Sequence, residues 1–339
     1  MARRTIVWLL LILCSVGLMT TRLLPSSRVP HGILLVANKG DQTLGIIDPA
    51  RGTQVATVSE GGVTGHEVIA SPDGRFAYVP IYGDSGVGKP GTSGSNMIVV
   101  DIAARKVVAN IDFGHGVRPH CPMFSPKDGL LYVTTEIDND VTVIDPHARK
   151  IVASIPTGHP ESHMLAITHD GHYGYTTNVG SGTVSVLDLE SRKTIDVISV
   201  APAVQRIALS VDDRLAFTSD QTKPQLAVID TRTRKVSSWI PLPASGYGTA
   251  ATPDGKYLVI AMPAASQVAV LNLKTMKVEH TVDVPAAPQE VLIRPDGAAA
   301  YVSCDQSHKV AEIRTADWTV ARLIDAGLGA DGLAWAREK

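Results

Sequence analysis

Three histidines of this chain stand at the start of similar phrases, GHEVIASPDGRFAYV, PHCPMFSPKDGLLYV and SHMLAITHDGHYGYT, which contain His66, His120 and His163. In each phrase the histidine precedes a short apolar run, a turn and a second run. Neutral imidazoles are ligands of zinc, copper and iron, and three of them around one point leave a coordination position open for water or substrate. Such a site requires a fold that brings these distant histidines together.

An internal repeat predicts that fold. One recurring strand ends in an apolar residue followed by a polar one, which is usually aspartate. In chain order these polar residues are Asp48, Asp101, Asp145, Asp188, Asp230, Asn272 and Arg314. These positions are 53, 44, 43, 42, 42 and 42 residues apart. A period of this length, built from short strands without helical periodicity, is typical of a β-propeller with one blade per repeat.

Each repeat contains four expected strands. In the unit of His66 they are 68–71, 76–81, 97–102 and 106–111, and Pro72-Asp73-Gly74 forms the turn between the first two. Asp-Gly favours a tight turn because glycine adopts positive φ without a Cβ clash.

The two ends of the chain together supply one further blade. The N-terminal part contributes strands 33–36, 44–47 and 54–58, and the C-terminal part contributes a single strand, 331–336. Pairing them closes the ring and removes two exposed sheet edges. The sequence therefore predicts an all-β, seven-bladed β-propeller over residues 31–339, with four antiparallel strands per blade and a last blade shared by the termini.

Three phrases of the repeat, LYVTTEIDNDVTVIDP, GYTTNVGSGTVSVLDL and AYVSCDQSHKV, resemble the YVTN class of propeller repeats. The resemblance covers residues 33–336 and implies a propeller in an exported or surface setting. Propellers of this class include binding proteins, lactonases and cofactor-bearing oxidoreductases, so the resemblance implies no single activity.

Residues 1–30 predict export. Arg3 and Arg4 precede an uncharged apolar run, residues 5–19, which is typical of a signal peptide and short for a membrane span. A cleaved signal and an uncleaved N-terminal membrane anchor followed by a linker both remain open. The expected location is periplasmic, secreted or tethered to a membrane.

Composition excludes other classes of function. The net charge of −2 and the aromatic content of 5% offer neither a basic face nor a stacking platform for nucleic acid. Beyond the signal segment only Cys121 and Cys304 remain, and we expect both to be buried hydrophobes rather than a disulfide framework.

The repeat also predicts where the histidines lie. We call the face that holds the starts of the innermost strands, and the loops joining second to third strands, the top face. Six residues before each turn proline or its equivalent stands one residue per blade, the channel ring: His66, His120, His163, Gln205, Tyr247, Gln289 and Asp331. We expect this ring to surround the top of the central channel and to bind a ligand.

The three histidines of the channel ring suit a divalent transition metal, zinc or copper. Haem ranks below these metals, and because no Cys-x-x-Cys-His is present for covalent attachment, any haem would be bound noncovalently or carried by a partner. The alternative is that the histidines hydrogen-bond loop carbonyls and line a wet channel.

Further candidates lie in the loops of the top face. His115, Arg118, His159 and Glu161 precede the inner strands of the next two blades and are candidate ligand-binding or proton-moving groups. The stretch 82–97 adds about ten Gly/Ser-rich residues beside them, which predicts either a lid or a tolerated insertion.

Two classes of function follow from this pattern. The first is an exported scaffold that binds a small molecule, a polymer or an exported protein on the top face. The second is an enzyme: a lactonase-like hydrolase in which a metal activates water and Glu67 or Glu161 moves a proton, or a copper- or haem-associated oxidoreductase.

Overall fold

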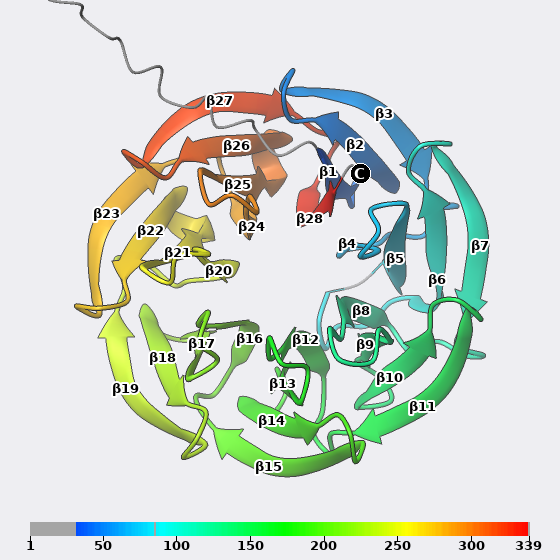
Figure 1. The fold of residues 1–339 in the computed structure, drawn as a ribbon, viewed down its shortest axis with the longest axis horizontal. Helices are drawn as coiled ribbons and strands as arrows, with labels where there is room; N and C mark the ends of the chain where they lie inside the picture. The colour runs from blue at the N-terminus through cyan, green and yellow to red at the C-terminus, as the bar shows by residue number, and fades with distance from the viewer. Residues whose placement is uncertain (1–31, 85, 338–339) are drawn as a thin grey trace, which may run out of the picture.

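The computed structural model describes residues 32–84 and 86–337, which form seven four-stranded antiparallel sheets. The sheets stand around a central axis as the blades of a propeller (Figure 1). The predicted all-β, seven-bladed fold is confirmed. The signal or anchor predicted at residues 1–30 lies outside the described residues. Within the described part, no helix has the length and apolarity to cross a membrane.

The strands follow the repeat, with the innermost strand of each blade first except in the last. They are β4 (Ile69–Ala70), β5 (Phe76–Gly83), β6 (Ser93–Asp101), β7 (Lys106–Asp112); β8 (Pro119–Phe124), β9 (Leu131–Thr135), β10 (Asp140–Asp145), β11 (Lys150–Pro156); β12 (Ser162–Ile167), β13 (Tyr173–Asn178), β14 (Thr183–Asp188), β15 (Lys193–Ser199); β16 (Val204–Leu209), β17 (Leu215–Asp220), β18 (Gln225–Asp230), β19 (Lys235–Pro241); β20 (Thr249–Ala251), β21 (Tyr257–Met262), β22 (Gln267–Asn272), β23 (Lys277–Asp283); β24 (Pro288–Ile293), β25 (Ala299–Cys304), β26 (Lys309–Arg314), β27 (Thr319–Asp325); and β1 (Gly32–Asn38), β2 (Thr43–Asp48), β3 (Thr53–Ser59), β28 (Ala330–Arg337). Two short 3₁₀ turns, η1 (Pro263–Ala265) and η2 (Asp305–Ser307), follow β21 and β25.

The recurring aspartate of the repeat closes the turn between the third and fourth strands. Asp48 Oδ1 accepts hydrogen bonds from the backbone N–H groups of Ala50 and Arg51, at 2.9 and 3.0 Å. In five other blades the side-chain oxygen at this position likewise accepts a hydrogen bond from a backbone N–H two or three residues later; these acceptors belong to Asp101, Asp145, Asp188, Asp230 and Asn272. The period read from the sequence is therefore the period of this turn.

The Asp-Gly turns between first and second strands have a second device. Ser71 Oγ donates to Asp73 Oδ1 at 2.6 Å, and Thr168 and Asp170 repeat the pair at 2.7 Å. Gly74 follows with φ +73°, and a Cβ on it would lie 1.8 Å from the carbonyl oxygen of Arg337. Only glycine fits this turn, because the end of the chain passes directly against it.

The termini close the ring as predicted. β1 pairs antiparallel with β28, with Leu34 opposite Trp335, so the last blade takes its innermost strand from the C-terminus. In Figure 1 the blue β1 lies beside the red β28, which completes the circle.

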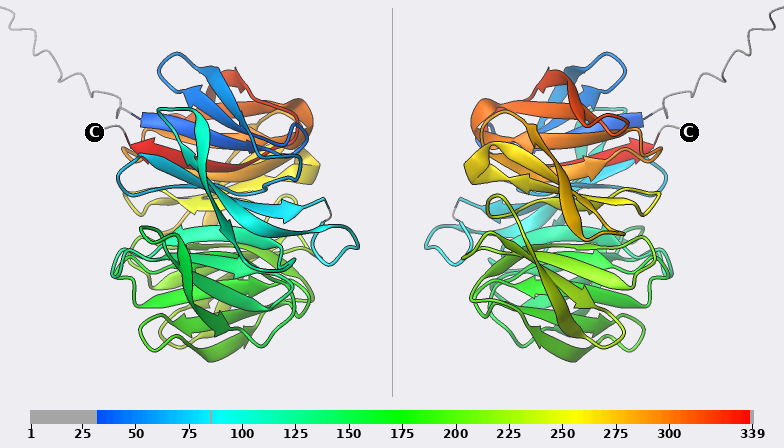
Figure 2. Two further views of the ribbon diagram at one scale, coloured as in Figure 1. Left: turned by 90° about the vertical axis from the view of Figure 1, so that its right-hand side faces the viewer. Right: turned by 90° about the vertical axis from the view of Figure 1, so that its left-hand side faces the viewer.

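The blade of His66 departs from the expected strand bounds. Its first strand is only β4, residues 69–70, while β5 and β6 continue past the expected ends and pair Gly83 with Ser93. Gly94 permits this continuation, because a Cβ there would lie 1.7 Å from the carbonyl oxygen of Ile81. Part of the inserted stretch thus extends the pairing of β5 with β6, and the rest forms a loop. Figure 2 shows the described residues of the loop 84–92, which are 84 and 86–92, projecting from the disc on the side away from the end of β28.

The closing blade offers a test of what holds the ring together. Leu34 on β1 is fully buried, whereas Leu323 on β27 is 50% exposed. We expect Leu34→Ala to lower the free energy of unfolding by about 2–5 kcal/mol, because it leaves a cavity beside the closing strands. Leu323→Ala is the matched control, with a change within about 0.5 kcal/mol. Urea unfolding measures both, and equal losses would contradict the importance of the β1–β28 contact.

Candidate functional site

The structure brings the three histidines of the repeat together at the top of the channel. The ring centroids of His120 and His163 are 3.8 Å apart, and those of His66 and His120 are 5.7 Å apart. Each histidine starts or precedes the inner strand of its own blade, so three segments distant in sequence meet as neighbours. We call these residues the histidine cluster.

Two residues of neighbouring strands complete the cluster. The ring of Tyr82 stacks on His66, with centroids 4.6 Å apart, and Tyr82 Oη donates a short hydrogen bond to Glu136. Glu136 Oε2 also lies 3.9 Å from His163 Nδ1. Tyr82 is fully buried and Glu136 is 2% exposed, so a carboxylate is enclosed beside the imidazoles.

All three imidazoles are held neutral. Burial, opposed by the charge of Asp331 and assisted by those of Lys39 and Arg206, lowers the pKa of His66 from 6.5 to about 4. The pKa values of His120 and His163 lie well below the ordinary value for the same first reason, burial. A neutral imidazole keeps a lone pair for a metal or a donor.

Several ring nitrogens of the cluster have no partner. Nδ1 of His120 and Nδ1 of His163 are buried without a hydrogen bond. His66 is partly exposed, and neither of its ring nitrogens has a hydrogen-bond partner among the described residues. Gln205 Nε2 lies 3.2 Å from Nε2 of His163. Unpartnered buried nitrogens are costly, and a bound group would relieve that cost.

The cluster as placed does not form a ready metal cage. Over residues 32–84 and 86–337, no group of three or more His, Cys, Asp or Glu side chains is arranged to hold a metal ion. The rings of His120 and His163 lie against each other at an interplanar angle of 31°. The zinc or copper site stays a prediction.

The loop 84–92 is tied to the histidine cluster through Arg118. Arg118 Nη2 donates to the carbonyl of Lys89 at 2.8 Å, and Nη1 lies 3.2 Å from Glu136 Oε1. The N–H of Gly88 donates to the same carboxylate oxygen at 3.1 Å. The loop therefore lies beside the histidine cluster, and the buried ion pair of Arg118 with Glu136 connects the two.

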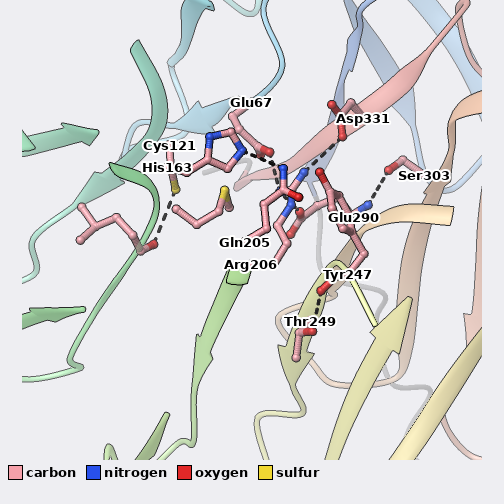
Figure 3. A network of polar contacts seen from close by, with 12 residues as sticks. Glu67, Cys121, His163, Gln205, Arg206, Tyr247, Thr249, Glu290, Ser303 and Asp331 are labelled. Carbon is pink, nitrogen blue, oxygen red and sulfur yellow. Dashed lines mark hydrogen bonds and ion pairs between the residues drawn. The ribbon is translucent and has the colours of Figure 1, made fainter. Parts of the chain in front are cut away.

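A second polar group lies across the channel beneath the ring of top-face residues. Arg206 is 3% exposed and its Nη1 hydrogen-bonds both Glu67 and Glu290, while Nη2 lies 3.3 Å from Asp331. Figure 3 shows Arg206 between these three carboxylates, with dashed lines marking the contacts. The guanidinium also lies 4.8 Å from the ring centroid of Tyr247.

The closing blade extends this ionic cluster. Lys39 Nζ lies 3.1 Å from Asp331 and 2.9 Å from Asp305. Burial raises the pKa of Glu67, and Glu290 raises it further while Arg206 opposes both. The ionic cluster therefore comprises Arg206, Lys39, Glu67, Glu290, Asp331 and Asp305.

The two carboxylates proposed as proton carriers do not contact the imidazoles. Glu67 pairs with Arg206 instead, beneath the channel ring. Glu161, half-buried at φ +62°, lies against Gly88 of the loop and Gly180. Glu136 occupies the place beside the histidines that the sequence assigned to these two residues.

The remaining candidates lie apart from the cluster. His115 is on the exposed rim, 2.9 Å from Asp138, which raises its pKa. His159 is half-buried, and its side chain has no hydrogen bond to the described residues. Gln289 bonds the carbonyl of Ala287 at 3.3 Å. Cys121 and Cys304 are free and buried, as predicted.

Residues missed in the sequence share one repeat position. This position stands at the end of the second strand of a blade. Its backbone N–H donates to the carbonyl of the residue two places before a channel-ring residue. The pairs are Lys39 with Gly329, Tyr82 with Thr64 and Glu136 with Arg118. The second missed position directly follows the channel ring and holds Arg206 and Glu290. Aligning the repeats at the end of the second strand and at the residue after the channel ring would have identified these polar side chains from the sequence.

Comparisons with known proteins agree with this fold. The chain matches the family model of the Cytochrome D1 heme domain over residues 91–206 and 126–246, which include His120 and His163. Its structure is similar to a chain of Kuenenia stuttgartiensis Hydrazine Synthase, with TM-score 0.72 and 21% identity, over 88% of this chain and 99% of that one. It is also similar to Dihydro-heme d1 dehydrogenase NirN in complex with DHE, with TM-score 0.65 and 13% identity, over 89% and 74%. No curated protein matches the sequence.

These findings define the class of protein. The matched family is one of seven-bladed β-propellers, and the structural neighbours are propellers. At these identities the structural likeness shows the fold alone. The matched family and the two structures named here do not carry the YVTN name, so that resemblance stays a prediction.

The buried ionic cluster yields a stability prediction. Arg206→Met leaves Glu67 and Glu290 buried without a cation, so we expect the free energy of unfolding to fall by about 3–5 kcal/mol. The control is Arg314→Met, which breaks an exposed pair with Asp317 and changes stability little. Urea unfolding of both variants decides, and losses of equal size would contradict the role assigned to Arg206.

A pH-dependent prediction concerns Glu60, which anchors the segment leading to His66 by accepting the N–H of Gly65 at 2.7 Å. Burial raises its pKa from 4.5 to about 7. The folded protein therefore binds more protons than the unfolded chain between these values, and stability falls as the pH rises through this range. Glu60→Gln keeps the acceptor without the charge.

We expect the stability of Glu60→Gln relative to the natural chain to rise by roughly 3 kcal/mol between about pH 4 and pH 8. Urea unfolding across this range measures it. Exposed Glu279→Gln on β23 is the control, with a profile parallel to that of the natural chain. A parallel profile for Glu60→Gln would show that Glu60 is not a buried, protonated group.

Proposed function

We propose that this propeller binds a haem-type cofactor noncovalently on its top face, with the histidine cluster as its site. One observation carries the proposal: three neutral imidazoles with unpartnered nitrogens meet at the top of the channel. A buried nitrogen without a partner is unfavourable unless something binds it.

The donor set fits haem iron, which takes a neutral imidazole as an axial ligand. His66 is the residue that we assign to this role, because its ring is partly exposed and neither nitrogen is bonded within the described chain. Tyr82 stacks on its ring and holds it in place. His120 and His163 lie behind it with one unpartnered nitrogen each.

The same region has a cation for the carboxylates of such a group. Arg118 already binds one carboxylate, Glu136, and a backbone carbonyl of the loop 84–92. Arginine pairs with carboxylates in a planar, bidentate manner. We assign to Arg118 the binding of a carboxylate of the cofactor, and to the loop the exclusion of water from the site.

The comparisons support haem over zinc or copper. The matched family is a haem domain, its matched regions include His120 and His163, and one similar structure is named for a complex with a haem derivative. The sequence lacks Cys-x-x-Cys-His, which excludes covalent attachment of haem but leaves noncovalent binding open. When bound through imidazole, haem supplies an iron centre that transfers electrons or takes a small ligand.

The predicted export segment completes the proposal. With residues 1–30 as a signal or anchor, the cofactor would be held outside the cytoplasm, and the top face would meet a small molecule or another exported protein. This setting is part of the proposal.

The test is a titration of the purified full chain with hemin, followed by visible absorbance. We expect saturation at about one hemin per chain, with an affinity that His66→Ala lowers by more than about tenfold. His147→Ala removes an exposed histidine from the turn after β10 and should leave the affinity unchanged.

Parallel titrations with zinc and copper distinguish the alternatives. Binding of either metal that is lost in His66→Ala, without hemin binding, would replace haem by a metal site. Equal hemin affinity in both histidine variants would overturn the proposal. Urea unfolding of each variant shows that the fold is retained.

A further inference from the structure

The lower half of the central channel contains a cavity of about 510 Å³. Its walls come from the innermost strands of all seven blades, β4, β8, β12, β16, β20, β24 and β28. His169 and Pro295, in the turns that follow two inner strands, and Arg337 at the end of β28 mark its mouth. The cavity therefore opens on the face opposite the histidine cluster, and its size is that of a small-molecule site.

The inner end of the cavity is acidic. Glu67 and Glu290 line its inner end, at the same level as Cys121 and Met164, since each of these residues directly follows a channel-ring residue. Arg206, which binds both, is not among the lining residues. The two carboxylates thus lie at the upper end of the cavity, and both accept hydrogen bonds from the guanidinium of Arg206.

Glu67 has an oxygen to spare. Its Oε1 is bonded to Arg206, and its Oε2 has no hydrogen-bond or ion-pair partner among the described residues. The side chain is 7% exposed, and the cavity is the free space that it lines. A carboxylate oxygen beside this space favours a cationic donor, because hydrogen bonds between charged groups are stronger than those between neutral ones.

The charges of the ionic cluster point the same way. Its two cations, Arg206 and Lys39, face four carboxylates, and Lys39 is already held between Asp331 and Asp305. Glu67 and Glu290 must therefore share Arg206, which also contacts Asp331. With all four carboxylates ionised, the ionic cluster carries two more negative than positive charges, and a cationic ligand at the inner end of the cavity would offset part of this excess.

The walls below the carboxylates are apolar. Side chains of every wall strand contribute, among them Ile69, Met123, Leu165, Ile207 and Val291. A ligand with one positive head and an aliphatic body satisfies both ends of such a space. We propose that the lower channel binds a primary aliphatic amine, with its ammonium at the carboxylates of Glu67 and Glu290 and its chain toward the mouth. This site is separate from the haem-type site and does not depend on it.

The first test compares two probes of equal chain length on the full protein by isothermal titration calorimetry. Octylamine carries the charge and octanol does not. We expect saturable binding of octylamine, and binding of octanol weaker by at least about tenfold, the usual loss with a charged hydrogen bond. No saturable binding of octylamine, or equal affinity for octanol, overturns the proposal without recourse to any variant.

Two variants then locate the site. Glu290→Gln should weaken octylamine binding at least about tenfold, while Glu279→Gln on the outer strand β23 should leave it unchanged. Ala250→Phe places a larger side chain at the wall of the cavity without changing a residue of the ionic cluster, and it should abolish octylamine binding. Octylamine binding that survives Ala250→Phe, in a protein shown by urea unfolding to be folded, would place the amine elsewhere and overturn the proposal.

Discussion

The pairing of β1 with β28 is the constraint on which the functional regions depend. It joins the two ends of the chain in one sheet and holds the first and last repeats at a fixed distance. The same blade supplies Lys39, just after β1, and Asp331, on β28, to the ionic cluster in the channel. An open ring would leave an exposed edge and separate these charges. Closure therefore stabilises the fold and assembles the channel in a single step.

Arg206 divides the channel into two chemically different halves. Above it lie neutral imidazoles, an aromatic ring and a buried carboxylate, which suit a metal-centred cofactor. Below it lies an apolar cavity that ends in Glu67 and Glu290, which suits a cation. The guanidinium donates hydrogen bonds to Glu67, Glu290 and Asp331, which belong to three different blades, and so it also connects the inner strands across the axis. One side chain thus serves the stability of the ring and the separation of its two faces.

Much of the fold could be predicted because each blade uses the same local chemistry. The aspartate that ends the third strand and the Asp-Gly turn both act within a few residues, so their period shows directly in the sequence. The histidines were found for the same reason, since they occupy one repeat position. Tyr82 and Glu136 were missed because their position looked like ordinary strand ends, and the hydrogen bond that joins them runs between neighbouring blades.

The number of blades, their strand order, the shared last blade and the face on which His66, His120 and His163 stand could all be predicted from the amino-acid pattern. Those properties follow from short-range turns and from alternation along strands. The contacts of Glu67 with Arg206 rather than with the histidines, and the place of Glu136 beside the imidazoles, became known from the folded arrangement. These choices depend on which charges meet across a closed ring, and burial makes each unpaired charge costly, so the pairing is settled by all blades together.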